Sequence, residues 1–151
     1  MQHVRETMPL LKQGYIDTGK VRYIYRPSFA VENDALRLAA ESLYCAGEEG
    51  KFWAMHDWQY GNNDALIEVS DDMTATLDLL IREAAPAIGL NTVNLAACLQ
   101  SERYRPVVEG FVEDARARNL TSTPTFLVNT ELKVGATYED LRALIEKELA
   151  K

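Results

Sequence analysis

Apolar residues recur at helical spacing in the first part of the chain. From residue 2 to residue 17 they stand three or four positions apart, which predicts an amphipathic helix. Pro9 lies inside this stretch and is expected to kink the helix, and Gly19 ends it. The next residues, Val21–Tyr25, are mostly β-branched or aromatic and stop at Pro27, so they predict a strand.

From about residue 31 to residue 119 the pattern is helical. Apolar positions follow a period near 3.6 residues, and glycine, proline or asparagine ends most of the stretches. We expect the third helix of this block to be capped by Ser70 or Asp71 and closed by Pro86 and Gly89. The expected helices cover about residues 35–47, 52–61 and 73–84, a stretch that opens at residues 90–92, and residues 104–119.

The pattern changes again after residue 120. Thr125–Val128 predicts a short strand, Asn129–Glu131 a tight hairpin connection, and Leu132–Val134 the returning strand. A closing amphipathic helix is expected over residues 138–149. Two parallel strands need a long crossover between them, and the helical block supplies one between the first and second strands. The sequence therefore predicts an α/β protein with a helical insertion at about residues 31–119.

Composition agrees with one globular domain covering residues 1–151. Hydrophobic residues make up 47% and charged residues 26% of the chain. The net charge of −7 and a pI near 4.9 argue against binding to nucleic acid or to anionic lipid. No apolar run is long enough to span a bilayer, and we expect no signal peptide in this chain because its first residues include no apolar segment of the secretory type.

Cys45 and Cys98 are the only cysteines and lie 98 − 45 = 53 positions apart. With no C-x-x-C and no cluster of Cys and His, the sequence predicts neither a metal site nor a local redox pair. On the residues alone, two buried thiols and one structural disulfide both stay open. His56, beside Trp53, is expected to be a core or rim histidine, and His3 a solvated histidine of the first helix.

The segment Leu120–Phe126, with Pro124 at its centre, is the local feature most closely tied to chemistry. A proline that enters an apolar strand cannot donate to the ladder, so it belongs at the first residue or on an edge. A tight turn into a strand is also where cis peptide bonds persist, although on the residues alone a trans bond between Thr123 and Pro124 is favoured.

Several segments together resemble the DsbA-like branch of the thioredoxin superfamily, which introduces disulfides into exported proteins. The resemblance covers nearly the whole chain and implies a thioredoxin-like fold with a helical insertion. The matching segments are Arg5–Pro9 as the first active-site helix, Val21–Tyr25 as the following strand, Ala39–Gly47 and Gly50–Asp57 at the start of the insertion, Ala97–Leu99 with Tyr104 as its later helix, and Ser122–Phe126 as the cis-proline loop, where the family usually has Gly in place of Ser122.

The chain departs from the family at the redox site. The family's C-x-x-C, and the strand before it, would precede Met1, so we expect no catalytic cysteine and no dithiol–disulfide cycle in this chain. The resemblance implies that Thr123 and Pro124 form the substrate-binding loop and that the backbone of Thr123 pairs with an extended polypeptide. It further implies that Cys45 and Cys98 form the second, structural disulfide that bridges the insertion in some relatives.

The missing strand would lie between Val21–Tyr25 and Thr125–Val128. Either these two strands pair directly, or a second chain fills the gap, as in a homodimer through unpaired sheet edges, or the chain is a fragment. The resemblance implies extended polypeptide substrates, a redox partner protein and an extracytoplasmic location, without cofactor or metal. Two other interpretations stay open: a non-catalytic thioredoxin-fold binding module, and a glutathione-dependent isomerase or transferase of the kappa type.

Overall fold

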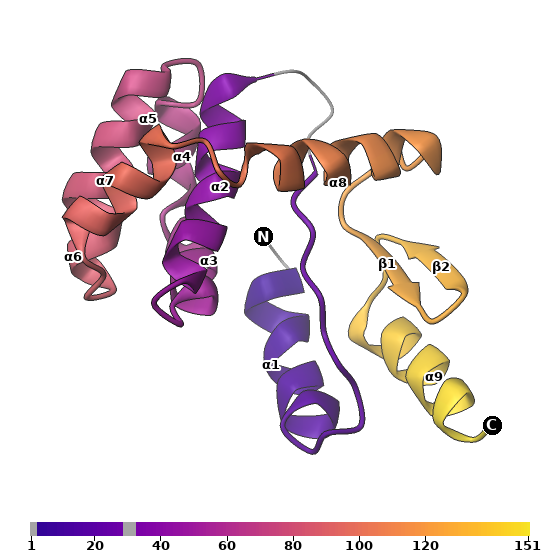
Figure 1. The fold of residues 1–151 in the computed structure, drawn as a ribbon. Coiled ribbons are helices and arrows are strands. Elements are labelled where there is room, and N and C mark those ends of the chain that lie inside the picture. Colours follow the sequence, from indigo (N-terminus) through magenta and orange to yellow (C-terminus); the bar gives the residue numbers. More distant parts are fainter. Residues whose placement is uncertain (1–2, 29–32) are drawn as a thin grey trace. The chain divides into compact units, whose positions relative to one another are not determined.

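The computed structural model describes residues 3–28 and 33–151, so the predicted start of the insertion at residue 31 lies outside the described residues (Figure 1). The chain divides into two compact units. The first unit combines Met1–Arg26 with Ala115–Lys151, and the second is Pro27–Asp114. The single-domain organisation of residues 1–151 stays a prediction.

The opening helix of the first unit forms where the periodicity predicts it. It consists of a π-helical turn η1 (His3–Thr7), the short α-helix α1 (Met8–Leu11) and a second π-helical turn η2 (Lys12–Ile16). Pro9 lies in the first turn of α1, which follows η1 without a break. The change from π to α geometry occurs next to Pro9, because proline interrupts the regular hydrogen-bond ladder.

The predicted strand Val21–Tyr25 is wrong. Among the residues that the structure describes, this segment belongs to no sheet, and the only sheet is the pair β1 (Thr125–Val128) and β2 (Glu131–Val134). Side chains still alternate, with Val21, Tyr23 and Tyr25 half-buried and the residues between them exposed. The local preference for an extended chain is therefore expressed, but a strand also needs a hydrogen-bonded neighbour. The alternative in which the two strands pair directly is excluded, whereas strand donation by a second chain stays a prediction.

The predicted hairpin is confirmed. Thr125 pairs with Val134 and Val128 with Glu131 in an antiparallel register. The turn is shorter than expected, since Glu131 already belongs to the returning strand, and Asn129 adopts a left-handed φ of 52° that asparagine tolerates well. Successive strand residues face opposite sides, so Phe126 and Val128 of β1 pack on one side.

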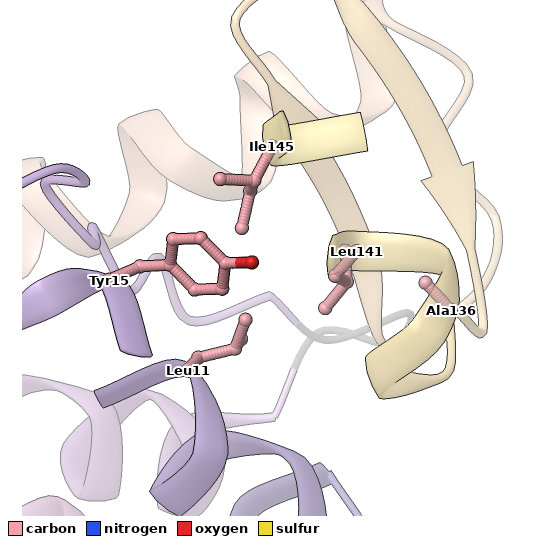
Figure 2. Close-up of a cluster of buried hydrophobic side chains, with 5 residues drawn as sticks. All are labelled: Leu11, Tyr15, Ala136, Leu141 and Ile145. Atoms are coloured by element: carbon pink, nitrogen blue, oxygen red, sulfur yellow. The ribbon is translucent and has the colours of Figure 1, made fainter. Parts of the chain in front are cut away.

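That side of the hairpin faces the hydrophobic core of the first unit. The core joins the opening helix to the closing helix α9 (Tyr138–Leu149) and consists of Leu11, Tyr15, Ala136, Leu141 and Ile145 (Figure 2). Thr137 caps α9 in a capping box with Asp140, and these hydrogen bonds from Thr137 hold the pKa of the Asp140 carboxyl below its usual value. The same core fixes both helices against β1.

The second unit contains the helices of the predicted insertion. Leu43, Met55, Leu80, Leu95 and Val108 are fully buried in it. The helices are α2 (Asp34–Gly47), α3 (Phe52–Gly61), α4 (Asn63–Glu68), α5 (Met73–Leu79), the π-helical turn η3 (Leu80–Ala84), α6 (Ala85–Ala87), α7 (Thr92–Gln100) and most of α8 (Arg105–Ala117), which continues into the first unit.

Details of this unit differ from the prediction in three ways. The expected helix at residues 73–84 continues through η3 into α6, so Pro86 lies in the first turn of a helical segment, and Gly89, with φ of 65°, follows the end. The cap is Asp72, whose carboxylate accepts hydrogen bonds from two backbone N–H groups, not Ser70 or Asp71. The helix α4 was not predicted, because none of its residues is buried and it lacks a strong apolar period.

Candidate functional site

The candidate site is the proline loop, residues 121–125, where α8 has ended and β1 begins. The Thr123–Pro124 peptide bond is cis. The loop is braced from both sides of the proline: the Thr125 hydroxyl donates to the carbonyl of Ser122 at 2.5 Å, and the N–H of Gly135 donates to the carbonyl of Pro124 at 2.9 Å. The second bond ties the loop to the end of β2.

Thr123 precedes the proline, and its backbone is available for binding. Thr123 and Pro124 are both exposed, and among the described residues the backbone of Thr123 takes part in no hydrogen bond. An exposed backbone N–H and C=O next to a strand end can accept an extended polypeptide as an added strand. The bracing of Ser122 and Pro124 presents these groups in a fixed position, which lowers the entropic cost of docking.

The amino end of the opening helix lies beside the same strand. The ring centroids of His3 and Phe126 are 4.6 Å apart, and Phe126 is two residues beyond Pro124. His3 Nε2 is 3.2 Å from the hydroxyl of Tyr23, a hydrogen bond whose donor depends on the histidine tautomer. The expectation of a solvated His3 is wrong, since its ring is half-buried between an aromatic residue of β1 and one of the extended segment.

A second contact fixes the opening helix from its other end. The Tyr15 hydroxyl donates to the Glu146 carboxylate at 2.6 Å, from η2 to α9. This hydrogen bond is the largest cause that raises the pKa of Tyr15, and burial adds to the rise. The opening helix is therefore held to α9 at one end and to the region of the proline loop at the other.

Both cysteines lie in the second unit and are bonded to each other. Cys45 on α2 and Cys98 on α7 form a disulfide with their Cα atoms 5.9 Å apart. The two residues are 5% and 2% exposed, and the chain has no free cysteine. A substrate disulfide cannot reach sulfur atoms that are buried in this way, so the bond is a structural element and not a redox centre.

Polar side chains of the second unit have structural partners. His56 is 3% exposed, with Nδ1 2.9 Å from Asp57 and its ring between Trp53 and Tyr60, as expected for a core histidine. Glu48 accepts a hydrogen bond from the Tyr104 hydroxyl at 3.0 Å. Among the described residues, no group of three or more acidic, His or Cys side chains is arranged to hold a metal ion. No helix in the described part of the chain is long and apolar enough to cross a membrane.

Sequence reasoning missed the contact of His3 with Phe126 and Tyr23. Its components were visible as an aromatic residue in each extended segment and a histidine at the first turn of a helix. Nothing local indicated that these three residues meet, because 126 − 3 = 123 positions separate the outermost two.

Comparison with known proteins indicates the family of this chain. Residues 3–147 match a family model described as Thioredoxin. The probable disulfide bond formation protein D of Bacillus cereus is 25% identical over 148 residues, which are 95% of this chain and 65% of that protein. The protein of the same name from Bacillus anthracis shows the same identity and coverage. The chain spans just under two thirds of the length of these relatives.

A similar segment also occurs in a larger protein of another name. The Na(+)/H(+) antiporter NhaA 3 of Salinispora tropica is 30% identical over 123 residues, which are 80% of this chain but 17% of that protein. No solved structure matches the chain significantly. Since the family model extends over nearly all described residues and the two Bacillus relatives match almost the entire chain, this chain belongs to the thioredoxin superfamily, as a DsbA-like member.

Proposed function

We propose that the chain is the scaffold and substrate-docking part of a thiol–disulfide oxidoreductase that acts on exported polypeptides. The observation that carries this proposal is the free backbone of Thr123, exposed beside the cis bond to Pro124 and braced by Ser122 and Gly135. An extended polypeptide pairs with that backbone in the manner of an added strand. The relatives named for disulfide bond formation support the reaction class.

The redox step requires groups that these 151 residues do not hold. Disulfide exchange begins when a thiolate attacks a disulfide, and a second thiol then resolves the mixed disulfide. Cys45 and Cys98 are bonded and buried, so neither supplies the thiolate. We therefore expect the 151-residue chain to dock polypeptides without oxidising or reducing them. An extracytoplasmic location is part of the proposal, and it is supported by a disulfide of a kind that persists in oxidising compartments.

A non-catalytic binding module is the second candidate, and one observation favours it: the chain has no free thiol, yet the docking loop is intact. The two candidates share the docking step and differ only in whether a thiolate acts on the docked polypeptide. The kappa-type alternative has no comparable observation in its favour among the residues that the structure describes.

Docking is tested by NMR with the isotopically labelled 151-residue chain. The probe is a capped, extended peptide of Val, Thr, Ser and Lys residues without cysteine, histidine or acidic groups. We expect the amide signals of Thr123 and Thr125 to shift with peptide concentration and those of the hairpin turn at Asn129 to stay in place. If the Thr123 amide does not respond while the chain is folded, the docking proposal is wrong.

A pair of variants isolates the backbone group. Thr123→Pro removes the N–H that would pair with the peptide, whereas Thr121→Pro removes an N–H two residues upstream in the same loop. We expect the first variant to lose peptide binding and the second to retain it, with circular dichroism showing that both are folded. A separate insulin-reduction assay checks the absence of redox turnover, and any sustained turnover by the 151 residues would contradict the assignment of the two cysteines.

A further inference from the structure

The strand β1 has a second edge, on the side away from β2 (Figure 1). The N–H of Gly135 donates to the carbonyl of Pro124, so these two residues form a hydrogen-bonded pair of the ladder. Because such pairs alternate along an antiparallel ladder, the backbone N–H and C=O groups of Thr125 and Leu127 point away from β2. In the part of the chain that the structure describes, no other segment pairs with these groups.

This edge begins where the docking residue Thr123 lies. We infer that a polypeptide docked at Thr123 continues along β1 as an added strand and pairs with the backbone of Thr125 and Leu127. The inference rests on the proposed function and deepens it, because it names the class of substrate. That substrate is an extended segment long enough to span residues 123–127, with an apolar side chain beside Leu127.

The preference for an apolar side chain follows from the exposed face of the hairpin. Leu127 is 55% exposed, its cross-strand partner Leu132 is 49% exposed, and Val134 is 52% exposed. These side chains share one face of the hairpin, opposite to the face on which Phe126 and Val128 pack against the core. In an added strand, the side chain opposite Leu127 lies on the same face. An apolar group there extends the row of apolar side chains and removes part of it from water.

Charge distinguishes the edge of β1 from the edge of β2. The strand β1 contains no charged side chain, whereas β2 contains Glu131 and Lys133, each of which forms an ion pair with a residue of α9. Charged side chains on an edge strand disfavour pairing with another chain. The edge of β1 is therefore the one that is open to an added strand.

A substrate segment fits this edge better than a second copy of the chain. In the first unit, residues 1–26 and 115–151, basic residues outnumber acidic ones by 11 − 7 = 4, so two copies of this unit repel each other. A polypeptide that is already bound at Thr123 holds its next residues beside Thr125. Pairing along β1 then occurs within the complex and needs no second encounter.

The test compares two proline variants at opposite residues of the hairpin. Leu127→Pro removes an N–H from the edge of β1, and Leu132→Pro removes one from the outer edge of β2. Both variants delete an exposed leucine, and neither removes a hydrogen bond of the ladder. The probe is a capped peptide of alternating Val and Thr with one Lys at each end. We expect Leu127→Pro to bind it roughly two- to tenfold more weakly than the wild-type chain, and Leu132→Pro to bind it as the wild-type chain does.

Hydrogen exchange of the wild-type chain gives a measurement that needs no variant. We expect the peptide to slow the exchange of the Leu127 amide and to shift the signal of the Thr123 amide. A second probe, in which Ser replaces each Val, should bind roughly two- to fivefold more weakly, the size expected for the loss of one apolar cross-strand pair. Equal affinity for the two probes would overturn the assigned substrate class.

The two amides separate this inference from the docking proposal. A response at Thr123 without slower exchange at Leu127 would overturn the inference and leave docking at Thr123 in place. No response at either amide of the folded chain would overturn the docking proposal itself. Slow exchange of Leu127 without peptide, increasing with protein concentration, would assign the edge to a second copy of the chain and overturn the inference.

Discussion

Reducing the bond between Cys45 and Cys98 should destabilise the chain by an amount that follows from the loop it closes. The two residues are 53 positions apart, and restricting an unfolded chain over a loop of that length stabilises the folded state by about 4 kcal/mol in the chain-entropy model. Small domains are commonly stable by only about 5–15 kcal/mol, so the loss is a large fraction of the total.

Noncovalent contacts next to the disulfide limit the damage. Glu48 follows α2 and binds Arg103 and Tyr104, which follow α7. Glu49 accepts hydrogen bonds from the backbone of Asn91 and the side chain of Asn94 at the start of α7. Because these contacts join the same two helices without the covalent bond, we expect the reduced chain to remain folded at room temperature, with lower stability.

Urea unfolding, followed by circular dichroism with and without a strong reductant, measures this difference. The double variant Cys45→Ala and Cys98→Ala is the control, because its unfolding curve should not respond to the reductant. A decrease on reduction of less than about 1 kcal/mol would refute the reasoning, since the unfolded chain would then gain little freedom from the broken bond. A shift of equal size in the control would show that the reductant acts elsewhere.

Three further changes test other parts of the structure by the same unfolding measurement. Tyr15→Phe removes the hydroxyl that donates to the partly exposed Glu146 carboxylate, and should cost about 1 kcal/mol; an unchanged stability would mean that water replaces this bond fully. Thr137→Ala removes the cap of α9 and should also cost about 1 kcal/mol, and a loss near zero would contradict the capping box. Burial raises the pKa of the Glu41 carboxyl above its usual value of 4.5, although Arg37 opposes the shift, so the folded state holds a proton that the unfolded state has released. The free energy of unfolding should therefore fall as the pH rises from about 4.5 through the raised pKa. Glu41→Gln should remove that fall, and an identical pH profile in the variant would contradict the assignment.

Local periodicity predicted the elements that bury one face and failed where a distant partner decides the outcome. The helix α2 was predictable because Ala35, Leu38 and Leu43 recur at helical spacing and become buried. The segment Val21–Tyr25 has the composition of a strand, yet a strand exists only when another segment shares its hydrogen bonds. The helix α4 was missed for the opposite reason, since it forms without burying any of its residues.

In the candidate site, too, the local features could be predicted and the long-range contacts could not. The proline loop and the cysteine pair could be predicted, because each lies in a segment with a recognisable resemblance to one family. The cis bond before Pro124 could not be derived from the residues alone, since trans bonds are far more common. The packing of His3 against Phe126 was also beyond prediction, because it joins two segments from opposite ends of the chain and depends on how the unit folds.

The proposed docking at Thr123 should be separable from thiol chemistry, because the contacts that hold the proline loop are all visible in this chain. Within the first unit, the docking loop is held by Thr125 on Ser122, by Gly135 on Pro124, and by a core that fixes β1 against two helices. None of these contacts involves sulfur, so the loop keeps its shape whether or not a reactive thiol is nearby. The affinity of the 151-residue chain for an extended peptide therefore measures the docking contribution alone. Any additional affinity or turnover seen when a reactive dithiol is supplied at the amino end of the opening helix would then be assigned to the thiolate and not to the loop.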